Sequence, residues 1–331
     1  MTFRIFAALA VLVAFPVSAH HSVNSFFDLN DPISVEGTLT SIRWANPHVR
    51  LSMERIGESG EMEQWSIESG GPTLLRRLGV TEELVELGDR VTVSGFPSRR
   101  DDEAMVGASL ALPDGREVPL FPTLAGHFGH EIRSGVHITD DAAAAASADG
   151  IFRVWTFESG DASVPDAILT EAALAGRAEF DPLIDDLALQ CIAPGMQIAM
   201  DNPFPIEFVD NGNEIVLRLE VWDNVRTIHL DEALASAPSE RSPLGFSVGR
   251  WEGRTLSVET TAINWPFFDD DGTPQSEAVE VVERFTLSAD DTRLHYEAVI
   301  TDPATLLEPA TRSMNWRWVP GEVLQSYNCT L

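Results

Sequence analysis

The stretch 244–261, LGFSVGRWEGRTLSVETT, limits the possible folds of this chain more than any other segment. Two strand-like runs lie on either side of Glu252-Gly253, where the glycine can adopt positive φ, so the stretch predicts a β-hairpin. Similar runs surround it, at 214–220, 225–230, 278–287 and 292–301. We therefore predict about eight to ten strands over residues 150–331, in an antiparallel meander that closes into a barrel or a strongly bent sandwich.

The first third of the chain predicts a second, smaller β domain over residues 20–120. Pro72 at a first helical turn and Gly79 after its end mark one helix among short strands. Three strands, a helix and two or three further strands follow the order of a small OB-like barrel. The strand-like runs are 33–44, 49–55, 63–68, 90–96, 105–112 and 116–120. A groove for single-stranded nucleic acid combines basic and aromatic residues, and because this segment is acidic we expect no nucleic acid there.

Between the two predicted domains, residues 121–149 carry Gly and His residues and then an alanine run, which predicts a linker. Three of these histidines, His127, His130 and His137, suggest a metal site. No cysteine and no regular i, i+4 pair on a helix accompanies them, so loop histidines are the better interpretation.

Residues 1–19 have the pattern of a secretory signal peptide, with a positive charge at Arg4, an apolar run over 5–17 and small residues at 17–19. The run is too short for a membrane span, and no later segment approaches the roughly 18 apolar residues that a span requires. We expect a periplasmic or secreted protein that begins at His20 and has no membrane span.

Charge narrows the range of partners. The 331 residues include 52 acidic and 22 basic ones, and the formal net charge is -30. Such an excess repels nucleic acids and anionic membrane surfaces. The chain contains no lysine, which excludes Schiff-base catalysis and a phosphate-loop lysine.

The two cysteines, Cys191 and Cys329, lie at the start and the end of the second half of the chain. Export to an oxidising compartment favours a disulfide between them. Such a bond would tie the end of the chain back to the entry of the second domain. Two free buried thiols are the alternative.

Several short motifs of this chain resemble motifs in families of exported bacterial proteins of unknown function. In the first third they are His20-His21-Ser22, Gly37-Thr38, Trp44-Ala45-Asn46-Pro47-His48, Glu68-Ser69-Gly70, the helix 74–79 and Leu112-Pro113-Asp114-Gly115-Arg116. In the second half they are Gly249-Arg250-Trp251-Glu252-Gly253, Glu283-Arg284-Phe285 and Thr301-Asp302-Pro303. In addition, Gly150-Ile151-Phe152-Arg153 resembles the first strand of lipocalin-type barrels. These resemblances imply export and a lipocalin-like second barrel, and they bring no activity with them.

One candidate site is the mature N-terminus. Cleavage after Ala19 gives His20 a free amine beside its imidazole, and His21 and His48 offer further nitrogens of the kind that copper and zinc accept. This set resembles the histidine brace of exported copper proteins, and it requires His48 to lie close to residue 20. The alternative is a frayed terminus, with His48 capping a turn.

A second candidate is Ser247, because residues 245–249 match the GxSxG nucleophile pattern. That motif requires a strand, a sharp turn and then a helix. Here another strand follows, so we expect Ser247 to be a strand residue and not a nucleophile.

A third candidate is a polar cluster within the barrel. Strand alternation places Thr227, His229 and Asp231 on one face of their strand and Arg226 on the other. Glu283 shares a face with apolar residues and is predicted to point into the interior. A cluster of His229, Asp231 and Glu283 can bind a polar group or act in general acid–base catalysis.

A buried carboxylate needs a partner or a raised pKa. The predicted partners of Glu283 are His229, Arg250 and Arg284. The alternative to a functional cluster is a structural ion pair between strands.

We therefore predict an exported all-β protein that binds a small, mostly apolar molecule in its C-terminal barrel. Aromatic side chains concentrated there can line a cavity or form the core; they are Trp222, Trp251, Trp265, Phe267, Phe268, Trp316 and Trp318. The residues predicted to bind the ligand are Arg226, Arg250, Trp251, Trp265 and Arg284. The alternatives are a hydrolase, isomerase or lyase that uses the His/Asp/Glu cluster, and a copper-binding protein that uses His20.

Overall fold

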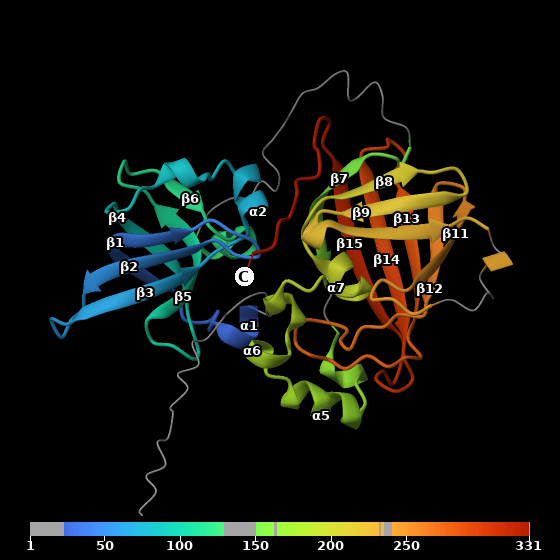
Figure 1. Cartoon of the computed structure of the whole chain (residues 1–331), viewed down its shortest axis with the longest axis horizontal. Coiled ribbons are helices and arrows are strands. Elements are labelled where there is room, and N and C mark those ends of the chain that lie inside the picture. The colour runs from blue at the N-terminus through green and yellow to red at the C-terminus, as the bar shows by residue number, and fades with distance from the viewer. Residues whose placement is uncertain (1–22, 129–149, 162–163, 232, 235–239, 331) are drawn as a thin grey trace, which may run out of the picture.

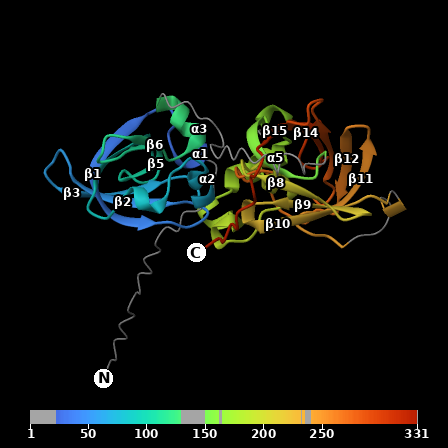
Figure 2. The same cartoon turned by 90° about the horizontal axis from the view of Figure 1, so that it is seen from above.

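Two β-barrels lie side by side in the computed structural model, which describes residues 23–128, 150–161, 164–231, 233–234 and 240–330 (Figures 1 and 2). The strands are β1 (Ile33–Arg43), β2 (Arg50–Ile56), β3 (Met62–Glu68), β4 (Arg90–Pro97), β5 (Ala104–Ala111), β6 (Glu117–Pro119), β7 (Val154–Asp161), β8 (Ile206–Asp210), β9 (Glu214–Leu219), β10 (Asn224–His229), β11 (Phe246–Glu252), β12 (Thr255–Thr261), β13 (Glu280–Leu287), β14 (Arg293–Thr301) and β15 (Ala310–Trp318). The α-helices are α1 (Val23–Phe26), α2 (Pro72–Arg77), α3 (Pro122–Ala125), α5 (Glu171–Glu179), α6 (Pro182–Asp185) and α7 (Met196–Asp201). The predicted two-barrel, all-β architecture is confirmed. The predicted signal peptide and residues 129–149 of the predicted linker lie outside the described residues.

The N-terminal barrel has five strands in the closed order β1-β2-β3-β5-β4, with β6 added beside β5. The pairs are antiparallel except β3 with β5, which run parallel and close the barrel. Helix α2 lies between β3 and β4 in the chain, starts at Pro72 and is followed by Gly79 at φ +76°. This is the predicted OB-like barrel.

The C-terminal barrel closes with nine strands in the order β10-β11-β12-β13-β14-β15-β7-β8-β9. The predicted hairpin is β11 and β12, and Glu252 pairs with Thr255. The turn residues are therefore Gly253 and Arg254, one position later than predicted. Of these two, Gly253 has positive φ, at +64°, which fits a type II′ turn.

The barrel departs from the predicted antiparallel meander at one place. β10 and β11 run parallel and pair only at Ile228–Ser247 and His229–Val248. Because these two strands run parallel, β11 starts at the same end of the barrel as β10, and a two-residue hairpin cannot join them in this way. The remaining four residues of β10 therefore have no partner in β11.

Large side chains fill the interior of the C-terminal barrel, as is usual for small barrels. The members with at most 2% exposure include Trp155, Phe208, Phe285, Tyr296 and Trp316. Several of these rings contact one another edge to face or tilted, such as Phe208 with Phe285 at 5.2 Å. Side chains therefore occupy the axis of this barrel.

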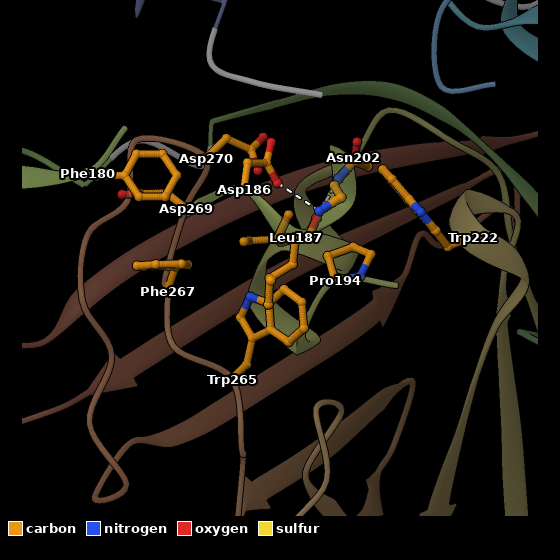
Figure 3. A pocket seen from close by; sticks show the side chains of 12 residues that line it. Phe180, Asp186, Leu187, Pro194, Asn202, Trp222, Trp265, Phe267, Asp269 and Asp270 are labelled. Atoms are coloured by element: carbon orange, nitrogen blue, oxygen red, sulfur yellow. Dashed lines mark hydrogen bonds between the residues drawn. The ribbon is translucent and has the colours of Figure 1, made fainter. Parts of the chain in front are cut away.

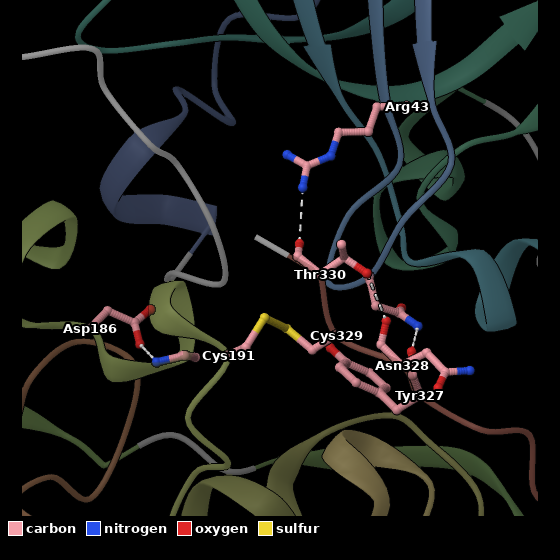
Figure 4. The surroundings of a disulfide bond; sticks show 9 residues. Arg43, Asp186, Cys191, Tyr327, Asn328, Cys329 and Thr330 are labelled. Atoms are coloured by element: carbon pink, nitrogen blue, oxygen red, sulfur yellow. Dashed lines mark hydrogen bonds between the residues drawn. A yellow bond between two sulfur atoms is a disulfide. The ribbon is translucent and has the colours of Figure 1, made fainter.

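The C-terminal segment after β15 runs between the two barrels (Figure 1). Cys329 in this segment forms a disulfide with Cys191, with a Cα–Cα distance of 5.7 Å (Figure 4). The predicted disulfide is confirmed and the free-thiol alternative is wrong. A disulfide is consistent with an extracytoplasmic protein.

The same segment contacts both barrels. The ring of Tyr327 stacks on Trp222 of the C-terminal barrel at 4.7 Å, and its carbonyl oxygen accepts a hydrogen bond from Asn46 Nδ2. Arg43 Nη2 donates to the carbonyl oxygen of Thr330 at 2.9 Å.

A buried ion pair adds to this contact between the barrels. Arg77 of α2 donates to both carboxylate oxygens of Glu220, at 2.6 and 2.5 Å. Burial alone disfavours the charge, yet the hydrogen bonds to Glu220 raise the pKa of Arg77.

Among the helices that the structure describes, none has the length and hydropathy needed to cross a membrane.

Candidate ligand-binding site

A cavity of about 450 Å³ lies where β10 and β11 fail to pair. Residues of β10 line it together with residues 193–194 and 242–246. The walls are mainly apolar: Ala193, Pro194, Val225, Pro243, Leu244 and Phe246. The polar lining residues are Asn224, Arg226, Thr227, His229 and Ser242. This volume and this mixture are typical of small-molecule sites.

Arg226 forms the buried end of the cavity and is 3% exposed. Its Nε donates to Ser247 Oγ at 2.9 Å, and its Nη1 donates to Glu283 Oε1 at 2.9 Å. Its Nη2 donates to Thr260 Oγ1 at 2.6 Å and also contacts Glu283 Oε2. A guanidinium has five N–H groups, so these bonds leave one N–H on Nη1 without a partner among the described residues.

Glu283 balances the charge of Arg226 inside the barrel. Its side chain is fully buried, and it also accepts from the hydroxyls of Tyr296 and Thr260, each at 3.1 Å. Burial disfavours the charge of Arg226, but the Glu283 carboxylate raises the pKa of that guanidinium. Burial, together with Glu283, holds the pKa of Tyr296 well above its usual value. The Tyr296 hydroxyl therefore keeps its proton and donates a hydrogen bond to Glu283.

Asn224 is a second polar group at the cavity, and sequence reasoning missed it. It is 8% exposed and lies two residues before Arg226, on the same inward face of β10. Its Nδ2 has no hydrogen-bond partner in the part of the chain that the structure describes. Alternation with Arg226 was the available signal, because a polar residue at i−2 shares its face.

His229 lies on the rim of the cavity. Its Nδ1 is 2.9 Å from Glu214 Oε1 on the neighbouring strand β9, and its ring stacks on Phe246 at 4.9 Å. Asp231 is exposed and accepts from the backbone N–H of Ala233.

The structure does not bring the predicted His/Asp/Glu cluster together. The partner of Glu283 is Arg226, whereas Arg250 and Arg284 are exposed and contact Glu252 on the outside of the barrel. The predicted alternation is present, but its inward face is the one that carries Arg226. Ile228 on that face is fully buried in the core and fixes this orientation. The roles proposed for these residues in binding or catalysis stay predictions.

The remaining predicted residues of the barrel lie apart from the cavity or behind it. Ser247 is a buried β11 residue that accepts from Arg226, with strand on both sides, as expected. Trp251 is 44% exposed and packs edge-on against Phe152 at 6.3 Å. Trp265 lines a second cavity.

This second cavity is small, about 10 Å³, which is room for one water molecule (Figure 3). Phe180, Trp222, Trp265 and Phe267 surround it together with Asp186, Asp269 and Asp270. Figure 3 shows the carboxyl groups of Asp186 and Asp270 beside each other.

The two carboxyl groups in this cavity hold protons more tightly than usual. Asp186 Oδ1 accepts from the backbone N–H of Ala188 at 2.9 Å, and its Oδ2 has no partner among the described residues. Burial raises the pKa of Asp186 to about 7. Burial and the charge of Asp186 raise the pKa of Asp270 well above its usual value.

The predicted metal ligands are only partly placed. His20 and His21 lie outside the described residues. His48 is 8% exposed, with Nδ1 2.8 Å from the carbonyl oxygen of Ser69 and Nε2 3.6 Å from Glu68 Oε1. Within the described ranges, no group of three or more His, Cys, Asp or Glu side chains is arranged to hold a metal. Copper or zinc binding at the N-terminus stays a prediction.

The linker histidines are also only partly placed. His127 Nδ1 is 3.2 Å from the carbonyl oxygen of Leu124, and its ring meets Phe96 edge-on at 5.4 Å. His130 and His137 lie outside the described residues.

Comparison with known proteins concerns the first barrel. Residues 8–106 match the model of a family described as a family of unknown function (DUF6152). The match ends within β5 and does not extend to the C-terminal barrel, where the cavity lies. A search of curated proteins found none that matches the chain. Residues 8–106 of this chain are therefore similar to the DUF6152 family of unknown function.

Proposed function

We propose that this is an exported, periplasmic or secreted protein that binds a small, mostly apolar molecule in the cavity between β10 and β11. The observation that carries the proposal is the cavity itself, about 450 Å³ of space with apolar walls and a buried polar end. Ligand sites typically combine a large apolar lining with a few fixed polar groups. The disulfide and the predicted signal peptide support export.

The packing of the barrel supports this position for the ligand. Tyr296 and Trp316 are at most 2% exposed and occupy the barrel interior. The opening beside β10 is a route to the buried Arg226 that does not require the core to be displaced.

Native mass spectrometry of the protein, exported by its own signal peptide and purified without an N-terminal tag, tests this proposal. Thr227 is exposed and lines the cavity, so Thr227→Trp fills it without changing the core. We expect a co-purifying organic adduct on the wild type and at least about a tenfold lower occupancy on the variant. Thr311→Trp, on an exposed position of β15, is the matched control and should retain the adduct. Equal occupancy in both variants contradicts the proposal.

A second candidate function is catalysis on the bound molecule, and the His229–Glu214 pair favours it. A carboxylate on Nδ1 orients an imidazole so that Nε2 can act as a base. Glu214, which was not among the residues predicted from the sequence, supplies this carboxylate. With p-nitrophenyl butyrate as a probe, His229→Asn should abolish hydrolysis, whereas His295→Asn, at an exposed position of β14, should not. Hydrolysis that is equal in the two variants rules out His229 as the base.

A further inference from the structure

We infer that the ligand of the cavity between β10 and β11 is an electrically neutral molecule with an apolar body and a carbonyl oxygen, which accepts hydrogen bonds from Arg226 and Asn224. The inference rests on the proposed function and adds the chemical class of the ligand. Four features of the cavity lead to it.

The first feature is the supply of donors at the buried end. Among the described residues, one N–H on Arg226 Nη1 and the Nδ2 of Asn224 have no hydrogen-bond partner. Both residues are at least nine-tenths buried and line the cavity. A buried donor without a partner costs free energy that a matching acceptor recovers. A carbonyl oxygen has two lone pairs and brings no proton that would itself need an acceptor.

The second feature is the charge of Arg226, which is already balanced. Glu283 contacts two of its nitrogens, and Tyr296 remains a neutral donor to that carboxylate. A carboxylate ligand would place a second negative charge beside one buried cation, which a low-dielectric site disfavours. The net charge of -30 repels an anion at longer range as well.

The third feature excludes a cationic head group at this end. The buried lining residues Arg226 and Asn224 supply a guanidinium and an amide, and the carboxylate that contacts Arg226, Glu283, is saturated by Arg226, Thr260 and Tyr296. A cation would meet Arg226 without a free counter-charge. A neutral ligand remains.

The fourth feature is the wall. Five apolar side chains line the cavity, and they are Pro194, Val225, Pro243, Leu244 and Phe246. These side chains offer contact area and almost no hydrogen bonding. The body of the ligand is therefore a hydrocarbon, and its carbonyl group sets its orientation.

Three probes of nearly equal shape test the inference. Acetophenone has the carbonyl, α-methylstyrene replaces its oxygen by a methylene group, and benzoate replaces its methyl group by a charged oxygen. We expect acetophenone to bind with a Kd at least about tenfold lower than either analogue. Affinity is measured by NMR titration, and chemical-shift changes at the Asn224 side-chain amide and at Phe246 show that the probes occupy this cavity.

Variants identify the groups responsible. Asn224→Leu should reduce the preference for acetophenone over α-methylstyrene at least about threefold, while α-methylstyrene binding persists. Arg226→Met alone leaves Glu283 buried without a counter-charge and can unfold the barrel, so the double variant Arg226→Met/Glu283→Leu is used beside it. We expect the double variant to lose the preference as well.

The outcomes separate the inference from the proposed function. If α-methylstyrene or benzoate binds in the cavity as tightly as acetophenone, the carbonyl inference is overturned and ligand binding in the cavity stands. If none of the three probes shifts Asn224 or Phe246, both the inference and the cavity as the binding site are overturned. A preference for acetophenone that survives in both variants overturns the assignment of Arg226 and Asn224.

Discussion

Arg226 and Glu283 face each other across the interior of the C-terminal barrel, from β10 and β13, and are 3% and 0% exposed. The two strands are not neighbours, because β11 and β12 lie between them in the sheet. The pair thus joins opposite parts of the wall, and it places a charged group at the buried end of the cavity. One arrangement therefore serves both stability and the proposed recognition of a ligand.

Removal of one member of this pair should be far more damaging than removal of both. Glu283→Leu or Arg226→Met leaves a buried charge without its counter-charge, and we expect a loss of about 3–5 kcal/mol in the free energy of unfolding. The double variant Arg226→Met/Glu283→Leu should recover most of that loss. Urea denaturation of the three variants measures the coupling.

An exposed ion pair is the control for this cycle. Arg90 and Glu36 contact each other with side chains 74% and 55% exposed, and Arg90→Ala should cost less than about 1 kcal/mol. If the single variants of Arg226 or Glu283 lower the free energy of unfolding as little as Arg90→Ala does, neither buried group needs its counter-charge.

The disulfide should contribute substantially to stability. Cys191 and Cys329 are 138 residues apart in sequence, and the loop-entropy argument assigns a bond of this span about 3–5 kcal/mol. Cys191→Ala/Cys329→Ala should therefore lower the free energy of unfolding and release the segment that packs Tyr327 on Trp222. Calorimetry of the wild type with and without reductant should reproduce the effect of the variant.

A thiol assay provides an independent check on the disulfide. The unreduced, denatured wild type should give no reaction, and its mass should be lower than that of the reduced form by two hydrogens. Two reactive thiols in the protein after export would refute the disulfide.

Asp186 should make stability depend on pH between about 4 and about 7. Its pKa is raised from 3.8 to about 7 on folding, so within this window the folded state holds a proton that the unfolded chain has lost. The free energy of unfolding contributed by this group therefore falls as pH rises through the window and is constant above it. Asp186→Asn keeps the hydrogen bond to Ala188 and removes the charge.

The free energy of unfolding of Asp186→Asn should exceed that of the wild type by about 2 kcal/mol at pH 8 and by little or nothing at pH 4. The value at pH 8 is reduced because Asp186 is partly exposed. Denaturation at pH 4, 6 and 8 measures the difference. Asp102→Asn, an exposed aspartate of the N-terminal barrel, controls for the loss of one negative charge. A gain for Asp186→Asn that is equal at all three pH values contradicts the assignment.

Local sequence signals located most of the strands correctly. The predicted runs 33–44 and 63–68 correspond to β1 and β3 within about one residue at each end, and Pro72 and Gly79 bounded α2 as expected. These signals are local, because alternation, a proline at a helix start and a glycine after its end act within a few residues. The inward orientation of Glu283 followed from the same alternation.

The sequence therefore determined by itself that the chain folds as two β domains, where most of its strands lie, and that Cys191 and Cys329 are able to pair. Only the tertiary structure decided which polar groups meet. Alternation separates the two faces of β10 but does not say which face is inside, and burial of Ile228 settles that question in favour of Arg226. The parallel pairing of β10 with β11, and hence the cavity, is a contact between strands that residues 230–245 separate in the sequence, so no local pattern predicts it. Contacts such as Arg226–Glu283 join residues 57 positions apart, and such long-range pairing is set by the closure of the whole barrel and not by any short stretch of sequence.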